Sequence, residues 1–331
     1  MKAIFLCENK HNINYVYGPA QQATLKRLTG LDGHVYTLDE ARGSEEARGA
    51  EVIFSTWGMP EVEYAEIPEV FPALRAVFYA AGSVQGFAEP FIRRGIAVFS
   101  AWQANAVPVA EYTLAQIILA AKGYFRVQAL CRASRADAAA LCRNYPGMFD
   151  IKVGLLGRGA VGGAVARRLR GFECEVYAYD PFAADEKLTA LGARRADIRQ
   201  IFEECDVISN HLANLPETRG IIKREHIFAM KEYATFINTG RGPQLDEGDL
   251  LDKLRECPGV TALLDVLSDE ENSDTNPLNA LPNCFITPHI AGSMGNEVRR
   301  MAQYMVEEYE RWVSGGDLRW QVSAQMLATM A

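Results

Sequence analysis

Short apolar runs, many of them rich in β-branched residues, recur along the chain and alternate with segments of helical periodicity. The runs lie at 3–7, 51–55, 76–79, 152–156, 175–179, 207–210, 234–238, 261–266 and 284–287. Strands bounded by turn residues and interleaved with helices indicate parallel sheets built from strand-helix-strand units. We therefore predict an α/β fold class, with two Rossmann-like or flavodoxin-like domains of parallel sheet and a cleft between them.

Two longer helical patterns suggest how the chain moves between domains. The first is expected to begin at Pro108, because proline suits a first helical turn, and to continue to Ala121 as a bridge. The second runs from about Asn296 to Val313, ends at Gly315, and could return the chain to its first domain. The predicted domains are thus 1–103 with about 295–331, and about 104–294.

The length, composition and net charge of the chain limit the kinds of function that it can have. With 331 residues, 49% of them hydrophobic, two domains are expected. The net charge of -8 and the pI near 5.3 disfavour nucleic-acid binding, which needs clustered Lys and Arg. Seven scattered cysteines without a C-x-x-C pair indicate free thiols and no metal site. No apolar run of about 18 residues is seen, and the apolar start ends at Glu8, so we expect a cytoplasmic protein without a membrane partner.

The strand predicted at 152–156 leads into a glycine-rich motif, G-x-G-x-x-G, at Gly157, Gly159 and Gly162. In such a motif the first glycine permits a tight turn. The second lets backbone amides approach a pyrophosphate, and the third lets helix and strand pack closely. The motif therefore predicts a dinucleotide-binding loop, whose helix dipole favours phosphate charge.

Residues around these glycines strengthen that prediction. Ala160 and Val161 complete the loop, and the next predicted strand ends at Asp180. A carboxylate about 20 residues after the glycines accepts hydrogen bonds from the adenosine ribose. It would also repel a 2′-phosphate, and Pro181 supplies no cation, so NAD is expected rather than NADP. The alternative is a glycine-rich turn without a ligand, with Asp180 as an ordinary strand cap.

Polar residues follow three more predicted strands. These segments are 236–242 (F-I-N-T-G-R-G), 263–270 and 286–292 (I-T-P-H-I-A-G). Ligands of open α/β sheets bind at the carboxyl ends of the strands, so all three segments are expected to face one cleft.

Taken in order, these motifs resemble the D-isomer-specific 2-hydroxyacid dehydrogenases. The resemblance spans about 75–320 and includes further matches at 105–111 (N-A-V-P-V-A-E), 216–220 (P-E-T-R-G) and 276–278 (N-P-L). It implies that 104–294 is the NAD-binding domain and that the remainder is the substrate (catalytic) domain. It also implies hydride transfer between NAD(H) and a small D-2-hydroxy acid or 2-oxo acid.

By the same resemblance, Arg241 binds the substrate carboxylate, His289 is the general acid and base, and Glu270 supports His289. The residue types suit these roles. A guanidinium holds a planar carboxylate bidentately, and an imidazole exchanges protons near neutral pH. The alternatives are an exposed arginine in a glycine turn, a structural histidine beside Pro288, and solvated loop charge at Glu270. The family usually has proline after this glutamate, where this chain has Glu271.

Secondary assignments follow from the resemblance. Asp265 would take the nicotinamide carboxamide, with Thr239 and His211 lining the cofactor near the ring. Backbone amides of the loop Gly82, Ser83 and Val84 would face the substrate carboxylate. In this loop the family often carries an Asp-Asn pair where this chain has Val84-Gln85-Gly86, so the resemblance does not identify the acid. Trp57 either lines the substrate pocket or is a half-buried aromatic residue of a loop.

Two other functions remain open. One is an NAD-dependent relative acting on another small anionic donor, such as formate or phosphite. The other is a non-catalytic NAD-sensing protein similar to a corepressor. The apolar helix near 105–122 exceeds what one domain needs to cover, so a homodimer is expected.

Overall fold

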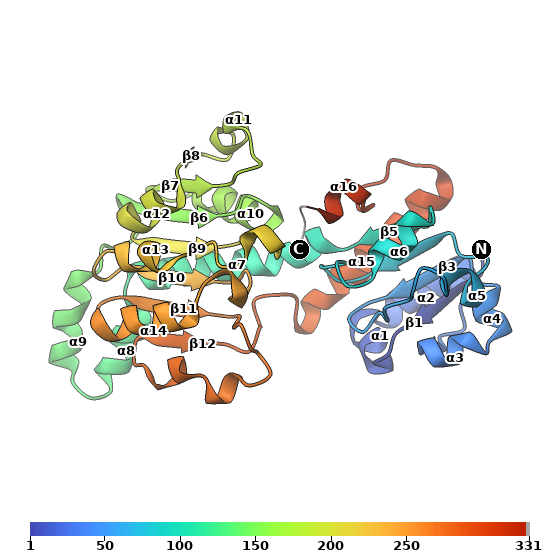
Figure 1. The fold of residues 1–331 in the computed structure, drawn as a ribbon, viewed down its shortest axis with the longest axis horizontal. Coiled ribbons are helices and arrows are strands. Elements are labelled where there is room, and N and C mark those ends of the chain that lie inside the picture. Colours follow the sequence, from blue (N-terminus) through green and yellow to red (C-terminus); the bar gives the residue numbers. More distant parts are fainter. Residues whose placement is uncertain (329–331) are drawn as a thin grey trace. The chain divides into compact units, whose positions relative to one another are not determined.

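The structure is a computed structural model that describes residues 1–328 (Figure 1). The chain divides into two compact units. Unit 1 comprises Met1–Ala106 and the segment that begins at Ser293, and unit 2 is Val107–Gly292. The boundaries expected from the sequence, after 103 and before 295, fall a few residues from these.

Unit 1 contains a five-stranded parallel sheet in the order β2-β1-β3-β4-β5. Its strands are β1 (Ala3–Leu6), β2 (Val35–Tyr36), β3 (Val52–Ser55), β4 (Ala76–Tyr79) and β5 (Ala97–Ser100). The central strands β3 and β4 are buried along their whole length, which explains their continuous apolar sequences. The strand order reverses between β1 and β3, where ligands of such sheets bind.

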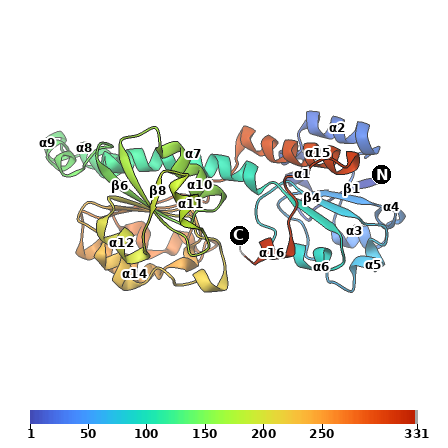
Figure 2. The same ribbon diagram turned by 90° about the horizontal axis from the view of Figure 1, so that it is seen from above.

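Helices cover both faces of this sheet. They are α1 (Lys10–Val16), α2 (Pro19–Thr29), α3 (Leu38–Arg42), α4 (Glu45–Arg48), α5 (Ile67–Val70), α6 (Ala88–Arg93), α15 (Val298–Ser314) and α16 (Ala324–Leu327). Figure 2 shows α2 and α15 on one side of the sheet and α3, α5 and α6 on the other. α15 buries Val298, Met301, Met305 and Tyr309 in the same core as the N-terminal strands, and its last residue, Ser314, is followed by Gly315, whose φ is 69°. The segment after 293 therefore completes unit 1.

Unit 2 contains a seven-stranded parallel sheet in the order β12-β11-β10-β9-β6-β7-β8. Its strands are β6 (Ile151–Leu156), β7 (Cys174–Tyr179), β8 (Ala193–Arg195), β9 (Val207–Asn210), β10 (Thr235–Asn238), β11 (Thr261–Leu264) and β12 (Cys284–Ile286). The order reverses between β6 and β9. The loops that follow these two strands, which begin at Gly157 and His211, therefore lie at the switch point where a doubly wound sheet binds its ligand.

Two apolar clusters sandwich this second sheet. One contains residues of α7 (Trp102–Ala121) and α10 (Ala160–Leu169), and the other contains residues of α12 (Ile198–Glu204), α13 (Arg224–Ala229) and α14 (Glu247–Glu256). Figure 2 shows α7 on one side of this sheet and α12 and α14 on the other. The remaining helices are α8 (Tyr124–Cys131), α9 (Arg135–Leu141) and α11 (Asp185–Thr189). Both sheets are parallel and covered by helices, as the predicted α/β fold class requires.

The start of α7 differs from the prediction. The helix begins at Trp102 rather than at Pro108, which lies in its interior. The amide of Asn105 already donates to the carbonyl of Ala101 at 3.1 Å, so helical hydrogen bonding is established before the proline is reached. An interior proline removes one helical hydrogen bond and its ring crowds the carbonyl four residues earlier, so α7 continues through Pro108 at a local cost in stability.

The sequence was expected to contain no apolar run of about 18 residues, and α7 is the helix that tests this expectation. By length and composition it is apolar enough to cross a membrane, although Gln103, Asn105 and Glu111 interrupt the run. More than half of its most apolar window, 56%, is buried inside the protein. A buried core helix meets the same criteria, so α7 alone does not indicate a membrane span.

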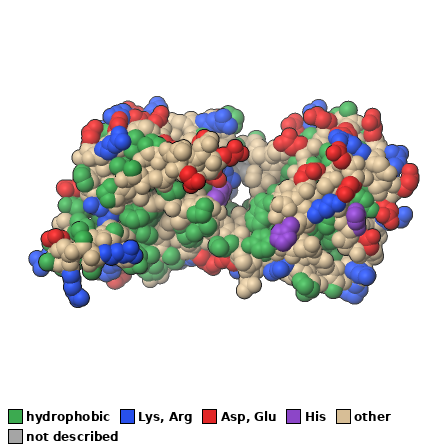
Figure 3. All heavy atoms as spheres, turned by 90° about the horizontal axis from the view of Figure 1, so that it is seen from below, with side chains coloured by type: hydrophobic (Ala, Val, Ile, Leu, Met, Phe, Trp, Pro, Cys, Tyr) green, Lys and Arg blue, Asp and Glu red, His purple; other side chains and the backbone are tan. Residues whose placement is uncertain are grey.

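Charged side chains of both signs are spread over the surface shown in Figure 3. Several form ion pairs within one unit, such as Lys152 with Glu204 at 2.7 Å and Arg224 with Asp249 at 2.8 Å. All seven cysteines lie within the described residues and are unpaired there. Burial raises the pKa of Cys205 and of Cys284 to about 12, so these two thiols are held in the neutral form.

Candidate active site

The glycine motif lies between β6 and α10, where its first and third glycines are required by the protein itself. Gly157 has a φ of 89°, and a Cβ there would lie 2.7 Å from the carbonyl oxygen of His211. A Cβ on Gly162 would lie 2.0 Å from the carbonyl oxygen of Gly157. These glycines therefore permit the tight turn and the close contact between helix and strand.

Gly159 differs from its two neighbours because a Cβ there would meet no atom within 4 Å. The residue precedes α10, whose N-terminus has no side-chain cap. The amides of Ala160 and Val161 are at the start of this helix, where they have no partner within the helix. Open space beside uncapped amides at a helix N-terminus fits the pyrophosphate of a dinucleotide, so Gly159, Ala160 and Val161 are the residues that would hold it.

Asp180 follows β7 and lies against the same loop. Its Oδ2 accepts a hydrogen bond from the amide of Arg158 at 2.8 Å, and its Oδ1 accepts one from the amide of Phe182 at 2.9 Å. A carboxylate retains lone pairs beyond these two hydrogen bonds. The structure therefore brings the predicted ribose-binding carboxylate to the turn that contains Gly157 and Gly159.

His211 and Thr239 are in contact with each other. Nδ1 of His211 lies 3.1 Å from Oγ1 of Thr239, and its Nε2 lies 3.0 Å from Oγ of Ser209. Burial lowers the pKa of His211 to about 3. The imidazole is therefore neutral near pH 7, and its hydroxyl partners add no charge beside the glycine loop.

Arg241 follows β10 at the start of a short 3-10 turn (Gly242–Gln244). Its Nη1 donates to the carbonyl of Gly240 at 2.7 Å. Burial lowers the pKa of Arg241, while the charge of Glu270 acts in the opposite direction. A guanidinium starts so far above neutral pH that it stays charged. Arg241 is thus a half-buried cation close enough to Glu270 to be influenced by it.

Glu270 and His289 form a direct pair. Oε2 of Glu270 lies 3.0 Å from Nδ1 of His289, and both side chains are nearly half exposed, at 46% and 47%. The neighbouring Glu271 is exposed. Because Nδ1 faces a carboxylate, it carries a proton, and Nε2 remains the nitrogen available for exchange with a ligand.

Asp265 supports the loop that carries His289. Its carboxylate is buried and accepts hydrogen bonds from Thr287 Oγ1 (2.6 Å), Ile290 N (2.8 Å) and Ala291 N (2.9 Å). His289 itself has a φ of 55°, a left-handed conformation that is uncommon outside glycine. The sequence assigned Asp265 to the nicotinamide carboxamide, and it showed no sign of these hydrogen bonds to the His289 loop.

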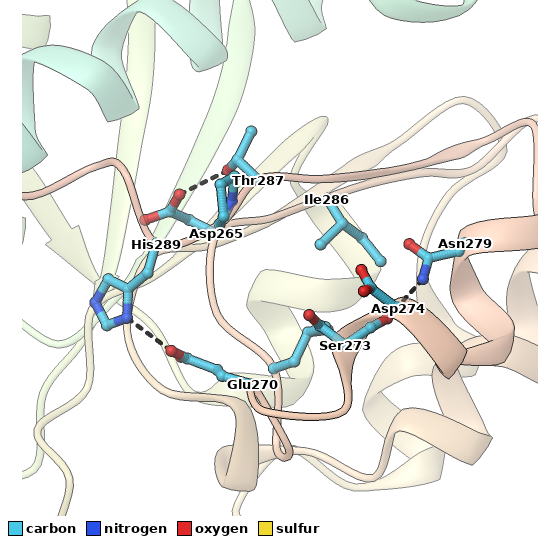
Figure 4. Close-up of a pocket in the computed structure, with 10 residues that line it drawn as sticks. Asp265, Glu270, Ser273, Asp274, Asn279, Ile286, Thr287 and His289 are labelled. Carbon is cyan, nitrogen blue, oxygen red and sulfur yellow. Dashed lines mark hydrogen bonds and ion pairs between the residues drawn. The ribbon is translucent and has the colours of Figure 1, made fainter.

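A pocket of about 320 Å³ in unit 2 collects several of these side chains. Figure 4 shows His289 and Glu270 pointing toward each other at one end of the pocket, with Asp274 and Asn279 at the other. Asp265 and Thr287 also line it. The pocket therefore lies beside the His289–Glu270 pair and is lined by both polar and apolar groups.

The loop Gly82, Ser83 and Val84 belongs to unit 1 and follows β4. Oγ of Ser100 donates to the carbonyls of Ala81 (2.9 Å) and Gly82 (2.6 Å). Within residues 1–328 the amides of the three loop residues have no hydrogen-bond acceptor. Successive free amides of this kind suit a carboxylate. Ser100, which fixes the carbonyls, was not singled out in the sequence because nothing in the pattern linked β5 to this loop.

Trp57 also lies in unit 1, where it is partly buried against the apolar core. Its carbonyl accepts from Asn12 Nδ2 at 2.8 Å and from Cys7 Sγ at 3.2 Å. The partial burial of Trp57 is compatible with both interpretations, so its role at the substrate pocket stays a prediction. Throughout residues 1–328, no group of three or more His, Cys, Asp or Glu side chains is arranged to hold a metal ion.

Comparison with known proteins identifies the family. Residues 114–291, more than half of the chain, match the family model described as "D-isomer specific 2-hydroxyacid dehydrogenase, NAD binding domain". The chain belongs to the D-isomer specific 2-hydroxyacid dehydrogenase family. Its matched region is the NAD-binding domain of this family, so its cofactor is NAD.

Individual relatives in the family agree with this membership. The chain is 31% identical over 233 residues to D-3-phosphoglycerate dehydrogenase of Methanocaldococcus jannaschii, a match covering 70% of this chain and 43% of that protein. It is 29% identical over 247 residues to glyoxylate reductase of Korarchaeum cryptofilum, a match covering 73% of this chain and 74% of that protein. This chain thus spans less than half the length of the first relative.

A solved structure agrees with the fold. The NAD-complexed D-isomer specific 2-hydroxyacid dehydrogenase of Lactobacillus delbrueckii ssp. bulgaricus superimposes with a TM-score of 0.76 at 20% identity. The match covers 98% of this chain and 100% of that one. At this identity the similarity establishes the two-sheet family fold.

Proposed function

We propose that this chain is an NAD-dependent oxidoreductase that interconverts a small D-2-hydroxy acid and its 2-oxo acid. The observation that carries the proposal is the 3.0 Å contact between His289 Nδ1 and Glu270 Oε2. It leaves Nε2 of His289 as the proton-exchanging atom at a pocket in the domain that binds NAD. Because the chain belongs to a family with an NAD-binding domain, NAD is the hydride carrier in this proposal.

Arg241 binds the substrate carboxylate in this proposal. A guanidinium presents paired N–H donors to both oxygens of a carboxylate, and only Nη1 has a protein partner within the described chain. Its charge also polarises the neighbouring 2-oxo group. The half-buried position strengthens both effects, because fewer water molecules compete for the donors.

His289 moves the proton. When bound, NADH supplies the hydride that adds to the 2-oxo carbon. The imidazolium of His289 donates its Nε2 proton to the carbonyl oxygen, so the ketone becomes an alcohol and the imidazole becomes neutral. Glu270 holds Nδ1 throughout, which fixes the tautomer and the orientation of the ring. Oxidation of the hydroxy acid reverses each step.

The free amides of Gly82, Ser83 and Val84 provide a second anion-binding element in unit 1. We assign them to the substrate carboxylate. The preference for the D-isomer is taken from the family to which the chain belongs.

The experiment that tests this function is NADH oxidation measured against a panel of 2-oxo acids, followed by NAD⁺ reduction with the D- and L-forms of each matching hydroxy acid. We expect turnover with at least one acid and only with its D-form. Tight NADH binding without turnover of any acid would contradict the proposal and favour an NAD-sensing protein. Oxidation of formate or phosphite, without turnover of any 2-oxo acid, would favour the alternative of an NAD-dependent enzyme that acts on another small anionic donor.

We further propose a cytoplasmic homodimer. Leu114, Ile118 and Leu119 on α7 remain partly exposed, which leaves apolar surface for a second copy to cover. Sedimentation equilibrium tests this assembly, since a single species with the mass of one chain would contradict it.

A further inference from the structure

Three amide side chains are buried together beneath the turn that carries Arg241. Asn210 ends β9, Asn238 ends the neighbouring strand β10, and Gln244 closes the turn after Arg241. All three have no exposed surface. Asn210 and Asn238 are paired in the strand register, so their side chains start from adjacent positions at the same edge of the sheet.

Gln244 lies at the centre of this cluster. Its Oε1 accepts hydrogen bonds from Asn210 Nδ2 at 2.6 Å and from the amide of Arg241 at 3.1 Å. Its Nε2 donates to the carbonyls of Leu212 at 3.0 Å and Ala213 at 2.9 Å. One side chain therefore uses two acceptor and two donor positions, and each bond restricts where the turn can lie.

The two asparagines hold the other side of the same turn. Nδ2 of Asn238 donates to the carbonyl of Arg241 at 3.2 Å, and its Oδ1 accepts from the amide of Gly240 at 3.0 Å. Nδ2 of Asn210 joins Asn238 Oδ1 at 3.0 Å. Both backbone polar groups of Arg241 are thus bonded to buried amide side chains, while Nη1 of its guanidinium donates to the carbonyl of Gly240.

We propose that Gln244 is a positioning residue, which fixes the backbone of Arg241 so that the guanidinium is aimed at the substrate carboxylate. Its donor end ties the same turn to the 212–213 segment. The carbonyl of His211, immediately before that segment, lies against Gly157 of the dinucleotide loop. Gln244 therefore connects the predicted anion-binding arginine with the structure beneath the cofactor loop. This role rests on the function proposed above.

The chemistry of the cluster explains why a glutamine is suited to the position. An apolar side chain would leave the Arg241 amide and the Leu212 carbonyl without partners, and would take one of two acceptors from Asn210 Nδ2. A network in which every member is satisfied restrains its parts more firmly than isolated bonds do. A shift of the Arg241 turn by about 1 Å is enough to lower the rate of a reaction that depends on alignment by about 100-fold.

The test is Gln244→Met, which keeps the length and approximate volume of the side chain but makes no hydrogen bonds. We expect KM for the preferred 2-oxo acid to rise about tenfold or more and the dissociation constant of NADH, followed by fluorescence, to change much less. Exchange of the Arg241 amide hydrogen with solvent should become faster. Unchanged exchange at this amide would overturn the inference whether or not any acid is turned over.

Asn283→Leu is the matched control. Asn283 is also a buried amide of unit 2, and its Nδ2 donates to the carbonyls of Leu254 at 3.0 Å and Val260 at 2.8 Å. Its loss should lower the melting temperature without raising KM. If Gln244→Met behaved in the same way, with lower stability and normal KM, Gln244 would be structural only and the inference would be wrong.

A second variant separates positioning from stability further. In Asn210→Leu/Gln244→Met both members of the 2.6 Å pair are apolar, so the double variant should lose less stability than the two single variants added together, although the Leu212 amide and Asn238 Oδ1 still lose their bonds to Asn210. The Arg241 amide still lacks its acceptor, so KM should stay raised. Recovery of KM together with stability would contradict the positioning role. A wild-type protein that reduces no 2-oxo acid would instead contradict the proposed function.

If Gln244→Met does not fold, Asn210→Ala provides the test. It removes one donor from Gln244 Oε1 but retains the bond from the Arg241 amide. A smaller rise in KM, about two- to fivefold, is expected because the glutamine is less well held. A normal KM with reduced stability would again overturn the inference.

Discussion

Oε2 of Glu270 lies 3.0 Å from Nδ1 of His289, although the two residues are 19 positions apart in the sequence. Glu270 comes from the loop after β11, and His289 comes from the loop after β12. Because the two strands are adjacent and parallel, their carboxyl ends meet at the same edge of the sheet. The pair is a product of strand order, and it distinguishes Glu270 from the neighbouring Glu271.

Glu270→Gln should lower kcat for 2-oxo acid reduction about tenfold or more. The amide can still contact Nδ1, but it no longer provides the charged acceptor that fixes the tautomer and the orientation of the imidazole. Steady-state kinetics with NADH would measure the loss. Glu271→Gln is the matched control and should leave kcat near the wild-type value. Equal effects of the two substitutions would mean that the 3.0 Å pair has no special role.

His289→Gln should remove most of the turnover, about 10²- to 10⁴-fold, because the proton donor and acceptor is lost. NADH binding should stay nearly intact, as His289 does not hold the dinucleotide in this proposal. Single-turnover rates and NADH fluorescence titration test the two statements separately. Wild-type turnover in the variant would refute proton transfer by this residue.

Arg241→Lys should lower kcat/KM for the 2-oxo acid by about 10- to 100-fold. The ammonium keeps the charge but lacks the planar fork, and a hydrogen bond to a charged group contributes about 1.5–3 kcal/mol. Initial-rate measurements across a range of acid concentrations would show both a higher KM and slower turnover. An unchanged specificity constant would place Arg241 outside the substrate site.

Asp180→Ser should reduce the preference for NADH over NADPH by about tenfold or more. The carboxylate repels a 2′-phosphate, and serine removes that charge while keeping one acceptor for the amides of Arg158 or Phe182. Dissociation constants of the two cofactors would be compared. Asp137→Ser, which removes an exposed carboxylate of α9, should leave the preference unchanged. A similar change in both variants would point to overall charge as the cause.

Acid stability should depend on His211. Its pKa is lowered to about 3 in the folded protein, against an ordinary value near 6.5, so below pH 6.5 the unfolded chain binds a proton that the folded chain does not. Stability is therefore lost as pH falls from 6.5 toward 3, by up to about 1.4 kcal/mol per pH unit from this group.

His211→Gln should accordingly make the free energy of unfolding less dependent on pH below 6.5. Urea denaturation at a series of pH values measures that dependence. His11→Gln, at an exposed position, is the control and should keep the wild-type slope. An unaltered slope in the His211 variant would show that this imidazole is protonated equally in both states.

The apolar pattern located the buried strands well because those strands are covered on both faces. β4 and β9 have the predicted bounds, and several others differ by one or two residues. β2 and β8 were missed because a two-residue strand and the sequence Ala-Arg-Arg leave too few apolar positions. β5 was missed because its apolar residues continue almost directly into α7, the helix whose start was also misplaced.

The site residues could be named from motifs, but their supporting contacts could not. Nothing in the spacing of Asp265 and the His289 loop shows that one carboxylate accepts three hydrogen bonds from it. Gln244 likewise looks like an ordinary turn residue in the sequence, because its partners come from β9 and β10, which are brought together only by the sheet. Long-range polar contacts of this kind depend on strand order and register.

The discontinuous course of unit 1 has a consequence for biosynthesis. Its core includes the apolar face of α15, so residues 1–106 cannot bury their sheet fully until the segment after Ser293 has also been made. Residues 107–292 form a compact unit that is complete before that helix has been made. The apolar surface that α15 covers in unit 1 therefore stays exposed while the ribosome translates the residues between Ala106 and Ser293.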